Sequence, residues 1–297
     1  MKKTVKYFYA ALALVFLLLG TACQGETGLD TNSNSVNYAE LSVPAVPEQP
    51  VITLDTVPPY SGSPAIQIEG NRPRFKSKEK TTKAFETYSP LDDLGRCGVA
   101  FANVCKEIMP TEERGAIGAV KPSGWHTVRY DDLIDGKYLY NRCHLIGFQL
   151  AGENANPENL ITGTRYLNVE GMLPYENMVA DYVRKTGNHV LYRSTPIFKE
   201  NNLVASGVQL EAYSVEDSGQ GVSFNVYVYN VQPCIEIDYA TGESHSLAYI
   251  VNTNSLVFHR ADCKIGEKVS GKNRMSFTGT RDEAVEKGYK PCGVCKP

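Results

Sequence analysis

A histidine followed at intervals by neutral amides stands out in the middle of the chain: His144, then Asn159 and Asn168. A histidine can take a proton from water near neutral pH, and an amide oxygen can help to hold a hard divalent cation. Together these residue types suit hydrolysis of a phosphodiester with one loosely held Mg²⁺. On spacing alone, a buried structural histidine with two turn asparagines is the more common arrangement.

The elements around these residues decide whether they meet. The pattern predicts a strand that ends near Tyr140, a loop, and a second strand from Asn159. Apolar residues at helical spacing predict a helix over 175–185, with Pro174 near its start and Gly187 just beyond its end. This order of elements would bring four side chains toward one cleft: those of His144, Asn159, Asn168 and Glu176.

Further β signals flank this region. Alternating apolar and polar residues predict strands at 65–69, 190–193, 203–205 and 224–231. With the helix between them, they indicate an α+β domain over residues 58–245. Histidines 126, 189 and 245 have no ligand spacing to one another and are interpreted as loop or packing residues, and arginines 129 and 165 as solvated surface residues.

The N-terminus has the pattern of an export signal. Three lysines precede an apolar run over 7–19, and small residues stand directly before Cys23. The run falls short of the ~20 residues that a membrane-spanning helix needs, which argues against a simple anchor. The small residues before the cysteine resemble the lipobox of bacterial lipoproteins. This resemblance implies a lipoprotein-type signal over 1–23 and a lipid on Cys23.

Residues 24–57 are rich in Ser, Thr, Asn and Pro and have few large apolar side chains. Such a segment cannot bury a core, so we interpret it as a disordered tether. The protein is then expected to be exported and lipid-anchored on the outer face of the cytoplasmic membrane or on the cell surface, with a partly secreted form as an alternative. The sequence indicates no particular protein partner.

The net charge of the chain is −3, so no global basic field marks it as a nucleic-acid binder. The sign of the charge differs between segments: 24–57 contains acidic residues and no basic ones, whereas 246–297 has more Lys and Arg than Asp and Glu. Any contact with nucleic acid must therefore come from a local patch.

The stretch from residue 58 to about 244 resembles the DNA/RNA non-specific endonucleases of the ββα-metal class, and most closely their bacterial DNA-entry branch. The matching segments occur in order: LGRCGVAFANV, MPTEERGAIG, PSGWHTV, YLYNRCHLIGFQLAGENANPENLITGTRYLNVEGMLPYEN, TGNHVLYRSTPIF and FNVYVYNVQPCIEIDYATGES. The resemblance implies a ββα-metal fold on a mixed, mainly antiparallel sheet. It also implies a metal-dependent hydrolase that cuts DNA, and RNA as well, with little sequence preference.

The resemblance also assigns roles to residues. The family's Asp-Arg-Gly-His signature falls on 141–144, which makes His144 the general base that activates water. Asn168 would be the ligand of Mg²⁺, with Mn²⁺ as an alternative ion, and Asn159 would support the site. Glu176 would position metal-bound water. Arg142 would either neutralise charge at the scissile phosphate or hold the shape of the site.

Two residues depart from the signature: Asn141 replaces the aspartate and Cys143 replaces the glycine. Because of them, a catalytically inactive surface receptor for DNA uptake remains the alternative function. Cys143 could also be redox-sensitive or form a disulfide. With Cys97, Cys105 and Cys234 it allows three pairings, and four buried free thiols are an equal alternative.

The end of the chain contains a second chemical pattern, His259-x₃-Cys263 followed by Cys292-x₂-Cys295. Four soft ligands in two close pairs suit tetrahedral Zn²⁺, and a metal would stabilise a segment as short as 246–297. Two disulfides do not explain this pattern, because His259 cannot take part and three cysteines leave one unpaired. This segment also resembles the zinc-binding domain of Ada-type DNA-repair methyltransferases, with His259 in place of the methyl-accepting cysteine. Its lysines and arginines are equally explained by phosphate contacts or by solubility.

Overall fold

The computed structural model describes residues 52–131, 133–261 and 263–297. The expected signal at 1–23, the lipid attachment at Cys23 and most of the expected tether lie outside the described residues. Among the described residues, no helix has the length and apolar character needed to cross a membrane.

The nuclease-like region contains ten strands: β1 (Ala65–Gln67), β2 (Phe85–Tyr88), β3 (Ala100–Val104), β4 (Tyr140–His144), β5 (Leu160–Thr164), β6 (Val190–Ile197), β7 (Gly207–Ser214), β8 (Ser223–Tyr229), β9 (Ile235–Ile237) and β10 (Ser244–Ser246). Its helices are α1 (Phe148–Ala151), α2 (Leu173–Thr186), a π-helical turn at Leu167–Met172, and 3₁₀ turns at Leu54–Thr56, Glu69–Asn71, Ser77–Glu79 and Pro157–Asn159.

A six-stranded antiparallel sheet in the order β1-β8-β7-β6-β3-β2 forms the framework. Its long central strands, β6, β7 and β8, are buried along almost their whole length. This confirms the α+β class and the mainly antiparallel sheet that the sequence predicts. The strand expected at 203–205 is not one: Val204 donates its main-chain N–H to Tyr239 instead of joining the sheet, and β7 begins at Gly207.

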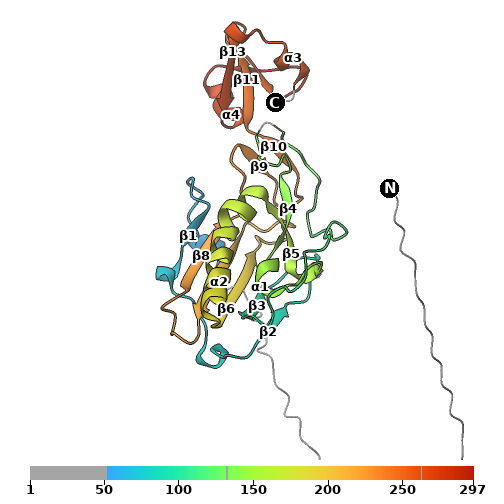
Figure 1. Cartoon of the computed structure of the whole chain (residues 1–297). Helices are drawn as coiled ribbons and strands as arrows, with labels where there is room; N and C mark the ends of the chain where they lie inside the picture. The colour runs from blue at the N-terminus through green and yellow to red at the C-terminus, as the bar shows by residue number, and fades with distance from the viewer. Residues whose placement is uncertain (1–51, 132, 262) are drawn as a thin grey trace, which may run out of the picture. The chain divides into compact units, whose positions relative to one another are not determined.

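Helix α2 covers one face of this sheet, as Figure 1 shows. Its buried residues Val179, Ala180 and Val183 pack in one cluster with apolar side chains of β3, β6, β7 and β8. Each of the two fully buried valines contributes about 1.5–3 kcal/mol to stability. The helix ends where the sequence predicts, because Gly187 adopts a left-handed conformation with φ 76°.

Strands β4 and β5 form a separate antiparallel pair beside α2, in which His144 is opposite Leu160. The chain then passes through the π-helical turn directly into α2. Two strands followed by a helix thus come from one continuous stretch, 140–186. This ββα unit contributes Cys143, Ile161 and Leu167 to the main core, which fixes it against the large sheet.

The packed body begins earlier than residue 58. Ile52 is buried in a cluster with Ile197 and Tyr227, and Leu54 and Val57 pack against the same cluster. Residues 52–57, which the sequence assigns to the tether, are therefore attached to the body.

A second sheet follows, in the order β13-β11-β12-β14, with strands β11 (Ala248–Asn252), β12 (Val257–Arg260), β13 (Arg274–Thr278) and β14 (Lys290–Pro291). Helices α3 (Lys264–Glu267) and α4 (Arg281–Glu286) and a 3₁₀ turn at Gly271–Asn273 complete this segment. Its core is small and aromatic, built around Tyr249 and Phe258 in edge-to-face contact.

Candidate active site

His144 is the last residue of β4, and both of its ring nitrogens have a neighbour. Nε2 lies 2.7 Å from the main-chain oxygen of Asn154, and Nδ1 lies 3.3 Å from a guanidinium nitrogen of Arg114. A carbonyl oxygen can only accept a hydrogen bond, so the proton of the neutral ring is on Nε2. The lone pair is therefore on Nδ1, where it accepts a hydrogen bond from the Arg114 guanidinium.

The charge state of His144 follows from its surroundings. The residue is buried, and burial is the main cause that lowers its pKa below the usual 6.5. The positive charge of Arg114 lowers the pKa further, whereas the carbonyl of Asn154 opposes the shift. The imidazole is thus neutral at neutral pH and able to accept a proton.

Arg114 is a site residue that the sequence reasoning does not single out. It lies on the exposed connection between β3 and β4, thirty positions before His144 in the chain. No spacing rule links two residues so far apart on an irregular segment. The one sequence signal is that Arg114 falls within MPTEERGAIG, one of the segments that carry the family resemblance.

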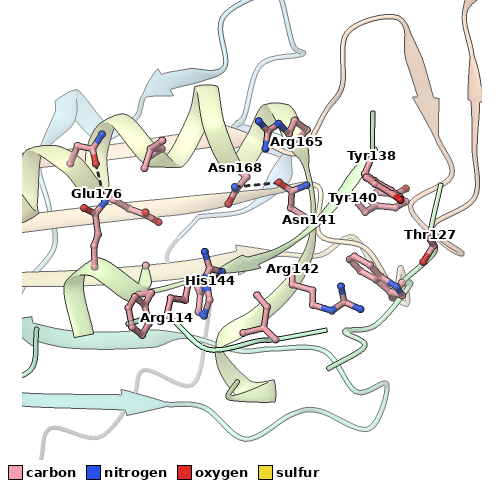
Figure 2. A pocket seen from close by; sticks show the side chains of 17 residues that line it. Arg114, Thr127, Tyr138, Tyr140, Asn141, Arg142, His144, Arg165, Asn168 and Glu176 are labelled. Carbon is pink, nitrogen blue, oxygen red and sulfur yellow. Dashed lines mark hydrogen bonds between the residues drawn. The ribbon is translucent and has the colours of Figure 1, made fainter. Parts of the chain in front are cut away.

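Asn168 lies in the π-helical turn, near Asn141 of β4 (Figure 2). Its amide nitrogen donates to the side-chain oxygen of Asn141 at 3.4 Å, which leaves the amide oxygen of Asn168 as the atom available to a cation. Asn141, the residue that replaces the signature aspartate, is thereby the residue that orients Asn168. The turn itself is anchored by Thr164, whose hydroxyl accepts the main-chain N–H of Leu167 at 2.9 Å.

Glu176, on the first turn of α2, brings a carboxyl group to the same cleft. Burial raises its pKa to about 7, although Gln149 and Arg114 act in the opposite direction. The close approach depends on Gly147, because a Cβ there would lie 2.5 Å from the carboxylate. A nearby cation would stabilise the charged form of this carboxyl.

Asn159 is fully buried and does not face the cleft. Its side chain accepts the main-chain N–H of Ile146 at 2.9 Å and donates to the oxygen of the same residue at 3.1 Å. Its own main-chain oxygen accepts the N–H of Leu145 at 2.8 Å. These bonds fix the chain immediately after His144, so Asn159 is a positioning residue.

Arg142 borders the cleft, but its guanidinium group is already engaged. It donates to the main-chain oxygens of Val120 and Gly118, and it lies 4.0 Å from the centre of the Trp125 ring. These contacts attach the connection at 118–125 to β4. Of the two roles that the resemblance allows, holding the shape of the site is the one these contacts favour.

The cleft has a volume of about 730 Å³ and is lined by both polar and aromatic side chains. Figure 2 shows that its labelled residues come from the connection before β4, from β4 itself, and from the helical segment after β5. The residues that could meet a phosphate or its cation are Arg114, His144, Arg165, Asn168 and Glu176.

Cys143 points away from the cleft into the core of the ββα unit and is fully buried. The space for its thiol comes from Gly163 on β5, where a Cβ would overlap its sulfur atom. This explains how the chain accommodates a cysteine in place of the signature glycine. Burial also raises the pKa of the thiol, so it remains protonated. In the described residues Cys97, Cys105, Cys143 and Cys234 are free thiols.

The C-terminal pattern also comes together in space. His259, Cys263, Cys292 and Cys295 each offer one ligand atom, and these four atoms lie within 4.8 Å of one another. His259 is on β12, Cys263 stands just before α3, and the two other cysteines follow β14. Three of the four residues are buried, which is the environment of a structural metal site.

Comparison with known proteins supports the nuclease interpretation. Residues 76–216 match the sequence model for DNA/RNA non-specific endonuclease. The crystal structure of NucA from Streptococcus agalactiae with magnesium ion bound is 27% identical, with a TM-score of 0.54 over 61% of this chain and 87% of that one. The same protein with no metal bound is also 27% identical, with a TM-score of 0.55 over 63% and 90%. Residues 76–216 thus form a DNA/RNA non-specific endonuclease domain.

Proposed function

We propose that this protein is an exported, Mg²⁺-dependent endonuclease that hydrolyses phosphodiester bonds of DNA and RNA without sequence specificity, with His144 as the general base. The observation that carries the proposal is the tautomer of His144, which directs a basic Nδ1 to the side of Arg114 in a cleft that also holds Asn168 and Glu176.

The donor atoms in the cleft fit a hard cation. Asn168 presents an amide oxygen, and Glu176 presents a buried carboxyl group whose pKa is raised to about 7 by burial. Oxygen ligands in small number, with the remaining positions open to water and phosphate, are what Mg²⁺ prefers. When bound, Mg²⁺ would neutralise charge on the phosphate and on the leaving oxygen.

The residues of the chain supply the rest of the chemistry. When a bound phosphate draws the Arg114 guanidinium away from Nδ1 of His144, that nitrogen takes a proton from water as the water oxygen forms a bond to phosphorus. The bond from phosphorus to the leaving oxygen breaks, and that oxygen takes a proton from solvent. Arg114 offsets negative charge on the phosphate as it develops, and Asn141 keeps the amide of Asn168 oriented. Because none of these contacts reads a base, cleavage has little sequence preference.

The experiment uses residues 24–297, which lack the signal and the lipidated cysteine, with plasmid DNA and ribosomal RNA as substrates, in Mg²⁺ or in EDTA. We expect both substrates to be cut only with Mg²⁺, and His144→Ala to be inactive. The matched control is His245→Ala, since His245 is exposed and pairs with Glu236 away from the cleft. Binding of DNA without cleavage under any metal condition would contradict the enzymatic function.

Export and lipid anchoring rest on the sequence of residues 1–23. We expect the mature protein to fractionate with membranes and to become soluble outside the cell when Cys23 is replaced by alanine in a chain that keeps a cleavable signal. Retention of both forms in the cytoplasm would contradict export.

We also propose that His259, Cys263, Cys292 and Cys295 bind Zn²⁺. Three thiol ligands and one imidazole suit this ion better than Mg²⁺. The small core around Tyr249 and Phe258 makes this segment dependent on the metal for much of its stability.

A further inference from the structure

Three side chains that can bind a metal meet at one end of the main sheet. Cys105, Glu107 and His189 each offer one ligand atom, and the three atoms lie within 4.8 Å of one another. Cys105 directly follows β3 and His189 directly precedes β6, the neighbouring strand. The register, in which Val104 pairs with Val190, places them side by side. They are distinct from the residues that line the cleft around His144.

A fourth residue orients the histidine of this group. Glu216 follows β7, the next strand of the same sheet, and one of its carboxylate oxygens lies 2.6 Å from Nδ1 of His189. The other oxygen accepts the main-chain N–H of His189 at 2.9 Å. The carboxylate thus holds a proton on Nδ1 and leaves Nε2 as the basic nitrogen. A carboxylate behind a histidine in this way is the usual companion of a metal ligand.

We propose that Cys105, Glu107 and His189 form a Zn²⁺ site, with Glu216 as its orienting residue and water in the fourth position. A thiolate, a carboxylate and an imidazole together favour Zn²⁺ over Mg²⁺ or Ca²⁺, which prefer oxygen ligands alone. When the bond from sulfur to zinc forms, the thiol proton of Cys105 passes to solvent. Cys105 is buried whereas Glu107 is exposed, so the water in the fourth position would lie on the solvent side of the site, near Glu107.

The site would connect segments that are far apart in the sequence. Its ligands lie at the end of β3 and at the start of β6, directly after the chain leaves α2 at Gly187. Zn²⁺ bound there would hold the end of the helix against two central strands of the sheet. Because binding requires the folded arrangement, Zn²⁺ is expected to raise the temperature of unfolding of the nuclease domain.

The test measures Zn²⁺ stoichiometry and affinity on the mature chain, in excess Mg²⁺, with a competing chromogenic chelator. Cys105→Ser and His189→Gln should each lose one equivalent of Zn²⁺ relative to the unsubstituted protein. Glu216→Gln should keep that equivalent but bind it about 10–100-fold more weakly. Cys97→Ser is the matched control, because Cys97 is also a buried thiol and it contacts the main-chain oxygens of Pro157 and Leu160 instead.

The same comparison in a Cys292→Ser, Cys295→Ser background separates this site from the C-terminal cluster. The loss caused by Cys105→Ser should persist there. Substitution of Co²⁺ should give a thiolate charge-transfer band that disappears with Cys105→Ser. If Cys105→Ser prevents folding, as judged by circular dichroism, the partly exposed His189 decides the question. Equal stoichiometry and affinity in His189→Gln and the unsubstituted protein would overturn the proposal.

Discussion

Nδ1 of His144 and a guanidinium nitrogen of Arg114 lie 3.3 Å apart, the first on a strand and the second on an irregular segment thirty positions earlier. The hydrogen bond from Nε2 to Asn154 gives the base its tautomer, and the arginine places a fixed positive charge beside it. A phosphate bound near Arg114 would therefore lie within reach of water activated by His144. This pairing provides the first prediction.

Replacing Arg114 by alanine should lower kcat by about 10²–10³, because a charge that stabilises the transition state is lost. Folding should be unaffected, since Arg114 is exposed. Arg114→Lys should recover part of the rate. Steady-state cleavage of a short duplex measures both, with Arg129→Ala as a control, because Arg129 is exposed and pairs with Asp131. A normal rate in Arg114→Ala would show that the residue is not part of the reaction.

Arg142→Ala should behave differently, because its main contacts are with the protein itself. It removes hydrogen bonds to Gly118 and Val120 and the contact with Trp125, which should lower the free energy of unfolding by about 1–3 kcal/mol. Urea denaturation followed by Trp125 fluorescence measures this loss. Unchanged stability with a large loss of rate would instead assign Arg142 to the phosphate.

The pH dependence of activity should reflect the lowered pKa of His144. The base acts only when neutral, so kcat/KM should fall on the acid side with a midpoint below 6.5. Because Arg114 contributes to the lowered pKa, its replacement by alanine should move the midpoint upward. An acid limb centred above 6.5 in the unsubstituted protein would contradict the assignment.

The same shift affects stability. The unfolded state takes up a proton near pH 6.5, whereas the folded state does so only at lower pH, so between these values the unfolded state binds more protons. The contribution of His144 to stability is complete above 6.5 and decreases as the pH falls through this window. His144→Gln should lack this decrease when denaturation is measured across the range.

Cys143→Gly should keep nuclease activity but lose about 1–3 kcal/mol of stability, because the thiol fills space beside Gly163 and a glycine is unfavourable within a strand. Thiol reagents should not inactivate the folded protein, since Cys143 is fully buried. If thiol reagents rapidly inactivated the unsubstituted protein but not Cys143→Gly, the thiol of Cys143 would be accessible. A redox role for Cys143 would then be supported.

Removal of Zn²⁺ with a strong chelator should unfold residues 248–297 before the nuclease domain. Limited proteolysis, followed by mass spectrometry, should then cut first within this segment, and Cys292→Ser should reproduce the pattern without chelator. If this segment resisted proteolysis both after chelation and in Cys292→Ser, the aromatic core around Tyr249 would be sufficient to keep it folded without Zn²⁺.

Periodic patterns allow the framework to be predicted from sequence. Helix α2 is predicted by apolar residues at helical spacing, with Pro174 near its start and Gly187 at its end. Strands β6 and β8 lie where β-branched and aromatic residues concentrate. The strand predicted at 203–205 is wrong because a short apolar run is expected both in a strand and in a buried connection, and Val204 and Ala205 are buried without joining the sheet.

The site is less predictable, because several of its properties depend on tertiary contacts. Spacing indicates that His144, Asn168 and Glu176 share a ββα unit, but it cannot show that Asn159 faces inward to hold Ile146. It also gives no sign of Arg114, whose position depends on the course of a long irregular segment. Spacing also gives no sign that His189 lies beside Cys105 and Glu216, because these residues are distant in sequence and meet only at the end of the sheet.

The most direct test of the central claim is chemical rescue of His144→Ala, with the rate of cleavage of a short duplex in Mg²⁺ as the readout. The loss of a general base should lower the rate by about 10²–10⁴-fold. Added imidazole should restore part of it, in proportion to the concentration of the neutral form. Activity in His144→Ala that remains within about threefold of the unsubstituted protein, far less than the loss of a general base allows, would contradict the role of His144.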